Sequence, residues 1–307
     1  MDREHPGQPQ RPPAYAHLLI DSKDRDPNAD RPPYEPTTEP ANDFTIYRNQ
    51  ALLYGYFTRL AITQVQLNWR MATIIPDVND TIVMTCDTAP LNNAIILDPG
   101  FYTPDTLATE LQNKIQAEGG ALATFTVIWW PETSGFLIES NSAAQFYFPT
   151  PNTFFAATGN LTQSKAYSRA CRTLGILNND DLDVEQYLSP PQLLWTRYID
   201  ICSRRLTKFQ RVKDIDTAGT DTKSFIIARV YLCPPGQRTT IDELSAPGDS
   251  PFDLVVDYNT PKQINWSPQE AVNELDLQVY DEFGELLPWD GAFANWEYQL
   301  TLVASET

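Results

Sequence analysis

The segment from Ala271 to Tyr280 constrains the fold most, because its side chains alternate between apolar and polar. From Leu275 onward an apolar residue recurs at every second position. Successive side chains of a β-strand point to opposite faces of a sheet, so this pattern is typical of a half-buried antiparallel strand. The 25 prolines against 13 glycines favour stiff connections and edge turns, which all-β proteins use freely. The sequence therefore predicts a mainly β protein.

Strand-like patterns recur along the whole chain. They lie at residues 44–47, 57–69, 81–86, 93–97, 193–202, 224–232, 252–256, 271–280 and 297–304. Within the second of these segments, Ile62, Val65 and Leu67 cannot share one face at a strict period of two, so a β-bulge or burial on both faces is needed. Many strands joined by proline-rich loops predict a β-sandwich, most simply a single jelly roll.

A different pattern interrupts the strands in the middle of the chain. Thr103 is suited to be a helix N-cap, Pro104 suits the first helical position, and the apolar residues that follow are four positions apart up to Ile115. Together with the segments that follow, this helix predicts a small α+β insertion. Those segments are two strands at residues 125–130 and 135–140, a second short helix within 164–177, and an acidic loop at 178–185.

These observations divide the chain into four parts. The parts are a proline-rich N-terminal arm at residues 1–42, the first part of the jelly roll at 43–92, the α+β insertion at 93–190 and the second part of the jelly roll at 191–307. Proline fixes φ and removes a hydrogen-bond donor, so we expect the flanks of the arm to be extended. Its apolar island, Ala16 to Asp21, is suited to adding as a strand to a sheet edge, in this molecule or in a neighbour. The alternative is a tail without fixed structure.

The chain is strongly acidic, with 22 Lys and Arg residues, 40 Asp and Glu residues and a formal net charge of -18. Nucleic-acid affinity depends on cations that contact phosphates, so this balance argues against direct nucleic-acid binding, and anionic membrane surfaces are disfavoured for the same reason. No segment has the ~18 to 20 apolar residues of a membrane helix, and Met1 to Pro13 lacks the apolar stretch of a secretory signal.

The four cysteines form no C-x-x-C pair and fit buried thiols in a reducing compartment. We expect a soluble protein made in the cytosol, without membrane insertion.

Patterns that carry catalysis or bind metals are scarce. The two histidines, His5 and His17, both lie in the arm, whereas a serine or cysteine nucleophile needs a positioned imidazole. We therefore predict no catalytic residue, no cofactor and no metal. The acidic clusters are interpreted as solvated loops, although the spacing after Asp214 weakly resembles the start of a calcium loop. The clusters are Asp180, Asp181, Asp183 and Glu185 in one loop and Asp214, Asp216 and Asp221 in another.

The seven tryptophans favour burial in a core or an interface over a sugar-stacking platform. Trp129 and Trp130 are adjacent, so they point to opposite faces of a strand and at most one is exposed on a given side. The other five lie at or near the ends of predicted strands. They are Trp69, Trp195, Trp266, Trp289 and Trp296.

The order of several segments resembles a known family. The segments are IDSKDRD at residues 20–26, NDFTI at 42–46, TQVQL at 63–67, LDPGFYTPDTLA at 97–108, LGI at 174–176 and LDLQVYDEFGELL at 275–287. This succession covers most of the chain and is similar to the penton or minor capsid proteins of virophages, Polinton-type elements and large eukaryotic double-stranded DNA viruses.

The resemblance implies a vertical single jelly roll, five copies of which close an icosahedral vertex as a homopentamer. It also implies an inserted outer domain, an N-terminal arm toward the neighbouring major capsid protein, and a location in the virion after assembly in the host cytoplasm or nucleus. The assembly residues that it indicates are Ile20, Asp21, Ser22, Arg25, Phe44 and Ile46. Another minor capsid protein and a glycan- or receptor-binding β-sandwich remain alternatives, and an enzyme with two carboxylates comes third.

Overall fold

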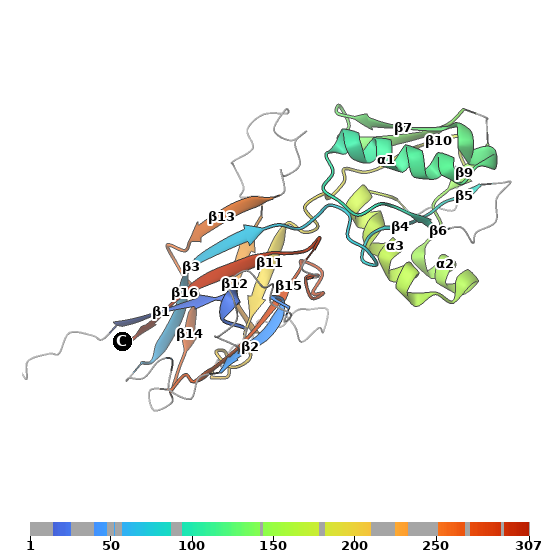
Figure 1. Ribbon diagram of the computed structural model, residues 1–307. Coiled ribbons are helices and arrows are strands. Elements are labelled where there is room, and N and C mark those ends of the chain that lie inside the picture. The colour runs from blue at the N-terminus through green and yellow to red at the C-terminus, as the bar shows by residue number, and fades with distance from the viewer. Residues whose placement is uncertain are drawn as a thin grey trace, which may run out of the picture.

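The computed structural model consists of two lobes that lie side by side (Figure 1). One lobe is a β-sandwich, and the other is a mixed α+β unit that we call the inserted lobe. The structure describes residues 15–25, 40–47, 52, 57–86, 94–141, 144–177, 182–209, 225–232, 251–267, 271–289 and 292–306.

The sandwich is built from two antiparallel sheets. The first sheet has the order β1 (Tyr15–Asp21), β16 (Glu297–Ser305), β3 (Arg59–Trp69) and β13 (Phe252–Asp257), and β14 (Gln263–Asn265) also pairs with β3. The second sheet has the order β12 (Ile226–Tyr231), β11 (Tyr198–Cys202), β15 (Glu274–Tyr280) and β2 (Asp43–Tyr47). A 3-10 turn, η1 (Ser22–Arg25), follows β1 and contacts both β16 and β2.

Strand pairing in the sandwich is nested. The first strand pairs with the last, β2 with β15, β3 with β13, and β11 with β12. A chain that pairs in this way is one long antiparallel hairpin rolled into two layers, which is the arrangement of a jelly roll. The predicted fold class, a mainly β jelly roll with an α+β insertion, is confirmed.

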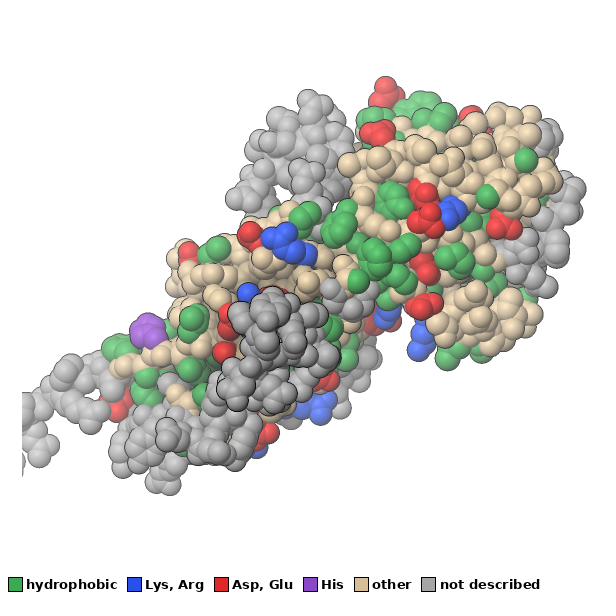
Figure 2. Space-filling model, viewed as in Figure 1, with side chains coloured by type: hydrophobic (Ala, Val, Ile, Leu, Met, Phe, Trp, Pro, Cys, Tyr) green, Lys and Arg blue, Asp and Glu red, His purple; other side chains and the backbone are tan. Residues whose placement is uncertain are grey.

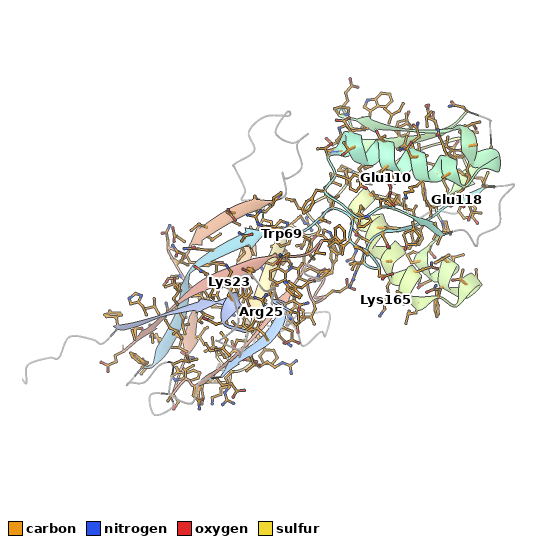
Figure 3. All side chains as sticks on the ribbon, viewed as in Figure 1. Lys23, Arg25, Trp69, Glu110, Glu118 and Lys165 are labelled. Atoms are coloured by element: carbon orange, nitrogen blue, oxygen red, sulfur yellow. The ribbon has the colours of Figure 1, made fainter. Side chains whose placement is uncertain are left out.

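The space between the sheets is filled by one apolar cluster. The indoles of Trp69 and Trp296 are fully buried in it, with ring centroids 6.5 Å apart. Figure 3 places Trp69 at the end of β3 nearest the inserted lobe. The pairing of β3 with β16 shifts register between Thr301 and Leu302. This irregularity is the predicted β-bulge, and it allows Ile62, Val65 and Leu67 to enter the same core.

The inserted lobe lies between β3 and β11 in the chain. Its strands are β4 (Thr81–Val83), β5 (Thr85–Cys86), β6 (Ala94–Ile96), β7 (Phe125–Trp130), β8 (Gly135–Ser140), β9 (Phe146–Tyr147) and β10 (Glu185–Tyr187). Its helices are α1 (Pro104–Ala117), η2 (Gly120–Thr124), α2 (Pro151–Thr158) and α3 (Leu161–Leu174). A separate apolar cluster, from Ile74 to Leu193, forms its core. This cluster begins before the expected boundary at residue 93, because β4 pairs with β6 and β5 pairs with β9.

Several elements of the inserted lobe follow the predicted pattern. The side-chain oxygen of Thr103 accepts a hydrogen bond from the Thr106 amide at 3.3 Å and caps α1, and the hairpin β7–β8 has the expected bounds. Helix α3 begins three residues before the expected range, because the side chain of Asn160 caps it at Leu161. It ends at Leu174, where Gly175 adopts a left-handed conformation with a φ of 74°. Helix α2 and the short strands β9, β10 and β14 were not predicted.

The strand expected at residues 193–202 is shorter in the structure. It starts at Tyr198, and the preceding residues form a turn in which Trp195 has a φ of 73°. A positive φ is incompatible with an extended strand, so the prediction was wrong for residues 193–197. The indole nitrogen of Trp195 donates to the carbonyl of Ala72 at 3.2 Å, which holds this turn against the chain that leaves β3.

Three cysteines, Cys86, Cys171 and Cys202, are free and buried, and Cys233 lies outside the described residues. In the part of the chain that the structure describes, no helix is long and apolar enough to cross a membrane.

Candidate assembly surface

Strand β1 lies along the last strand of the same chain. All seven of its residues pair with β16, from Tyr15 opposite Ser305 to Asp21 opposite Gln299. The apolar island therefore adds to a sheet edge within this molecule. β1 is itself an edge of the first sheet as described, and an edge strand offers backbone donors and acceptors on its open side.

Short polar side chains turn the chain at η1. Asp21 accepts a hydrogen bond from the Lys23 amide at 2.9 Å and another from the side-chain amide of Gln299 at 2.6 Å. The hydroxyl of Ser22 accepts from the Tyr298 amide at 3.0 Å. Asp and Ser compete well for nearby backbone groups, so the DSKDR segment fixes the point where the arm leaves the first sheet.

The side chain of Arg25 packs on the buried side of this corner. It is fully buried, and its guanidinium lies 5.4 Å from the ring centroid of Trp289. Nη1 donates to the carbonyl of Ser22, and Nη2 lies 3.6 Å from Oε1 of Glu297. A buried cation is tolerated when it is paired and hydrogen-bonded. Figure 3 shows Lys23, whose side chain is exposed to solvent, close to Arg25.

The remaining predicted assembly residues lie in the sandwich core. Ile20, Phe44 and Ile46 are 2%, 5% and 6% exposed. The ring of Phe44 lies 6.2 Å from that of Tyr298, and burial raises the pKa of the Tyr298 hydroxyl. The structure thus gathers the six residues near one corner of their own subunit. Their contact with a neighbour stays a prediction.

A groove of about 350 Å³ on the outward face of the first sheet was missed by the sequence analysis. Its lining is polar, with three carboxylates and one lysine. Lys23 Nζ lies 3.2 Å from Oε2 of Glu297 at its edge. The lining residues are Asp21, Lys23, Gln66, Leu67, Asn68, Asp253, Leu254, Val255, Glu297, Tyr298 and Gln299. The alternating polar residues of β3 after Thr63 were the available sequence signal.

The second sheet carries a different surface. Arg229 pairs with the buried Asp200 through two hydrogen bonds of 2.6 and 2.8 Å, and this hydrogen bonding raises the pKa of Arg229. After β11, the turn at Arg204 is held by Asp276, whose Oδ2 accepts from the Arg204 amide at 3.0 Å. The side chain of Arg204 is exposed. The sandwich therefore carries an acidic groove on the first sheet and an exposed arginine in the turn that follows β11 of the second sheet.

Few of the acidic clusters found in the sequence can be placed. Asp183 forms an isolated bridge with Phe146, and Glu185 begins β10. Asp180, Asp181 and the cluster from Asp214 to Asp221 lie outside the described residues. Within the described ranges, no three His, Cys, Asp or Glu side chains come close enough to hold a metal ion. His17 is exposed on β1, and His5 is not described.

The tryptophans divide between core and surface. The prediction of burial holds for Trp69, Trp195, Trp266 and Trp296, which are at most 8% exposed. Trp129 is also buried, with its ring 5.2 Å from that of Phe136. Trp289 and Trp130 are half-buried. As expected for adjacent residues of one strand, Trp129 and Trp130 point to opposite faces of the sheet.

Polar contacts join the two lobes. Oε2 of Glu285 in the sandwich accepts from Nε of Arg169 at 3.1 Å and from Nη2 of Arg172 at 3.2 Å, both on α3. The guanidinium of Arg172 also stacks on Phe283, 4.0 Å from the ring centroid. The loop after β15 therefore positions α3 against the sandwich.

These features define a single jelly-roll protein whose chain is interrupted by a second lobe between its third and fourth sandwich strands. Scans against protein-family models and curated proteins found no match. Among solved structures, the chain is similar to the mavirus penton protein, with a TM-score of 0.47 and 12% identity over 96% of this chain and 100% of that one. It is also similar to a chain of the Sputnik virophage structure, with a TM-score of 0.40 and 12% identity over 95% of this chain and 97% of that one. These likenesses concern the fold.

Proposed function

We propose that this protein is a structural capsid subunit and that five copies form a ring at an icosahedral fivefold vertex. The observation that carries the proposal is where the family-like segments fall in the fold. The arm segment forms the η1 corner, NDFTI enters β2, TQVQL lies in β3, and LDPGFYTPDTLA leads into α1. LGI ends α3, and LDLQVYDEFGELL forms β15 and the loop that contacts α3. The segments that resemble the family therefore lie in the strands, helix ends and turns that define the architecture.

The sandwich has the kind of surface that a ring of identical subunits needs. A ring closes through a heterologous interface, in which one side of a subunit contacts a different side of the next. Here the groove of the first sheet carries Asp21, Asp253 and Glu297, whereas the turn after β11 of the second sheet exposes Arg204. Opposite charges on the two sides orient neighbours and suppress wrong pairings. Two exposed apolar side chains on the first sheet, Val255 in the groove lining and Leu19 on β1, add contact area.

On this proposal the subunit acts through protein contacts, without catalysis and without a cofactor. Its partners are its own copies and the neighbouring major capsid protein, and its place is the virion. Direct nucleic-acid binding is not part of the role, because the chain carries a net charge of -18. Membrane insertion is not part of it either.

A charge exchange between the groove and the turn after β11 tests the ring. We expect Asp253→Arg alone and Arg204→Glu alone to convert pentamers into monomers in sedimentation velocity, and the double variant to recover part of the assembly. Asp105→Arg on α1 is the matched control, because it makes the same charge change away from the groove and from that turn. A wild-type chain that stays monomeric, or single variants that assemble as well as the wild type, would contradict the proposed interface.

A further inference from the structure

The sheet formed by β10, β8 and β7 in the inserted lobe has one covered face and one open face. Helix α1 packs against β7, and the covered face supplies Phe125, Val127, Phe136 and Ile138 to the core of the lobe. Side chains at the alternate positions point away from that core. Ile128, Leu137 and Tyr187 form one row across the three strands on this open side.

The open face has an apolar and aromatic centre. Ile128 is 47% exposed and Tyr187 is 53% exposed, whereas Leu137 is buried between them. The indole of Trp130 lies 6.2 Å from the ring of Tyr187, and its Nε1 donates to Oε2 of Glu132 at 3.1 Å. Figure 2 shows green side chains next to red carboxylates at the upper end of the inserted lobe, beyond α1. Aromatic residues beside an aliphatic centre are typical of the core of a protein interface.

Two carboxylates stand next to this centre without a cation. Glu139 of β8 is directly opposite Glu185 of β10, one row from Leu137 and Tyr187. Like charges at directly opposed positions of a sheet destabilise it. Neither carboxylate has a Lys or Arg within ion-pair distance in the described part of the chain.

The basic residues of the inserted lobe are engaged elsewhere. Lys114 pairs with Asp98, and Arg169 and Arg172 pair with Glu285 of the sandwich. Lys165 lies on α3, on the opposite side of the lobe from β7 (Figure 3). Among the residues that the structure describes, the open face is therefore left with acidic charge only.

We propose that the open face of the β10–β8–β7 sheet is a docking surface for a protein segment that carries Lys or Arg on either side of an apolar side chain. The apolar side chain packs on Ile128 and on the rings of Trp130 and Tyr187, and the cations neutralise Glu139 and Glu185. Charge complementarity selects this occupant, because a cation relieves a repulsion that the lobe does not relieve itself. The surface is separate from the groove and the arginine proposed for the ring, so either interaction can fail alone.

Binding of defined synthetic peptides to the full-length chain tests the proposal. The probes are short fluorescent peptides of alternating Leu and Lys, Ser and Lys, Leu and Ser, or Leu and Glu, measured by fluorescence anisotropy. We expect the Leu/Lys peptide to bind tightest, and Ile128→Ser or Glu139→Gln/Glu185→Gln to weaken it by about tenfold or more. Asp105→Asn/Asp257→Asn is the control, because it removes two charges from other exposed sites and should leave binding unchanged.

The remaining outcomes overturn the proposal. If the Ser/Lys and Leu/Lys peptides bind equally, or if the control variant loses as much binding as the test variants, the peptides are attracted only by the net charge of the chain. Binding to a glycan array that is lost in Trp130→Ala and Tyr187→Ala, without peptide binding, would make the face a sugar platform instead.

A second measurement needs no partner. Glu185→Lys places a cation opposite Glu139 and should raise the melting temperature by about 1 to 2 °C, as an opposite-charge cross-strand pair replaces a repulsive one. An unchanged or lower melting temperature would overturn the inference that the two carboxylates repel each other in the free protein.

Discussion

The contacts within the sandwich and those within the inserted lobe span very different distances along the chain. In the sandwich, Ser22 binds Tyr298 and Thr63 binds Thr301, so contacts span 276 and 238 residues. In the inserted lobe, α1 covers the strand that follows it, and β7 pairs with its neighbour β8. The sandwich therefore needs both ends of the chain, whereas the inserted lobe assembles from contiguous segments with its own core. The difference indicates two stability units within one polypeptide.

The largest loss of stability is expected when a buried side chain of the sandwich core is truncated. Trp296 is fully buried between the sheets, so Trp296→Ala should destabilise the sandwich by about 3 to 5 kcal/mol. Hydrogen exchange measured by mass spectrometry should show lost protection in β3 and β16 while α1 stays protected. Trp130→Ala, at a half-buried site of the other lobe, is the comparison variant. Equal loss of protection in α1 would show that the lobes unfold as one unit.

The complementary experiment destabilises the inserted lobe instead of the sandwich, by replacing two of its glycines. Gly159 and Gly175 both have a positive φ, of 68° and 74°. A Cβ at Gly175 would lie 1.9 Å from the carbonyl oxygen of Ser189, whereas nothing lies within 4 Å at Gly159. Gly159→Ala should cost about 1 to 2 kcal/mol from the backbone conformation, and Gly175→Ala a further 1 to 3 kcal/mol, roughly, from the overlap. Urea titrations that rank the two variants equally would contradict the close approach at Gly175.

A smaller effect is expected at the arm. Arg25→Met removes the buried guanidinium from Trp289 and from the Ser22 carbonyl, and should cost about 2 kcal/mol. Lys23→Met should change stability by less than about 0.5 kcal/mol, because an exposed ion pair contributes little. Limited proteolysis should cut β1 faster in Arg25→Met alone. Equal cleavage of both variants would mean that Arg25 does not hold the arm.

The smallest effect is expected at the contact between the lobes, and it depends on pH. Burial acts to raise the pKa of Glu285, but Arg169 and Arg172 outweigh it, and the net pKa is lowered. A lowered folded-state pKa stabilises the protein above the ordinary value of 4.5, and this contribution is lost as the pH falls through the folded-state pKa.

Glu285→Gln should therefore reduce stability by about 0.5 kcal/mol at neutral pH, a small value because the pair is partly exposed. In denaturant titrations its difference from the wild type should vanish in acid. Burial is the main cause that raises the pKa of Asp281, and the charge of Glu285 raises it further, so replacing Glu285 also lowers the pKa of Asp281. A difference that persists well below the folded-state pKa of Glu285 would show that the effect is not electrostatic.

The same contrast between local and distant contacts explains what could be predicted from the sequence. Helix α1 and the hairpin β7–β8 carry their signals within a few residues, such as Thr103 and Pro104 at the helix start. Helix α2 starts with the same pair, Thr150 and Pro151, and was predictable on the same grounds. The short strands β9 and β10 exist only because of their partners, so no local pattern marked them.

The candidate surface was predictable only in part. The DSKDR segment and the apolar island identified the corner, but the partner of β1 lies almost 300 residues away and cannot be read from a local pattern. The groove depends on four strands in register, and Arg204 on a turn beyond the end of β11. The turn at Trp195 was missed because a positive φ at a tryptophan has no sequence signature.

Native mass spectrometry of the full-length chain is the most direct test of the proposed role. A ring-forming subunit should give a species of five times 34.7 kDa, which Asp253→Arg converts to single chains. A wild-type chain that gives only the single-chain mass, at concentrations where the fold is intact, would contradict a subunit that closes a vertex with its own copies.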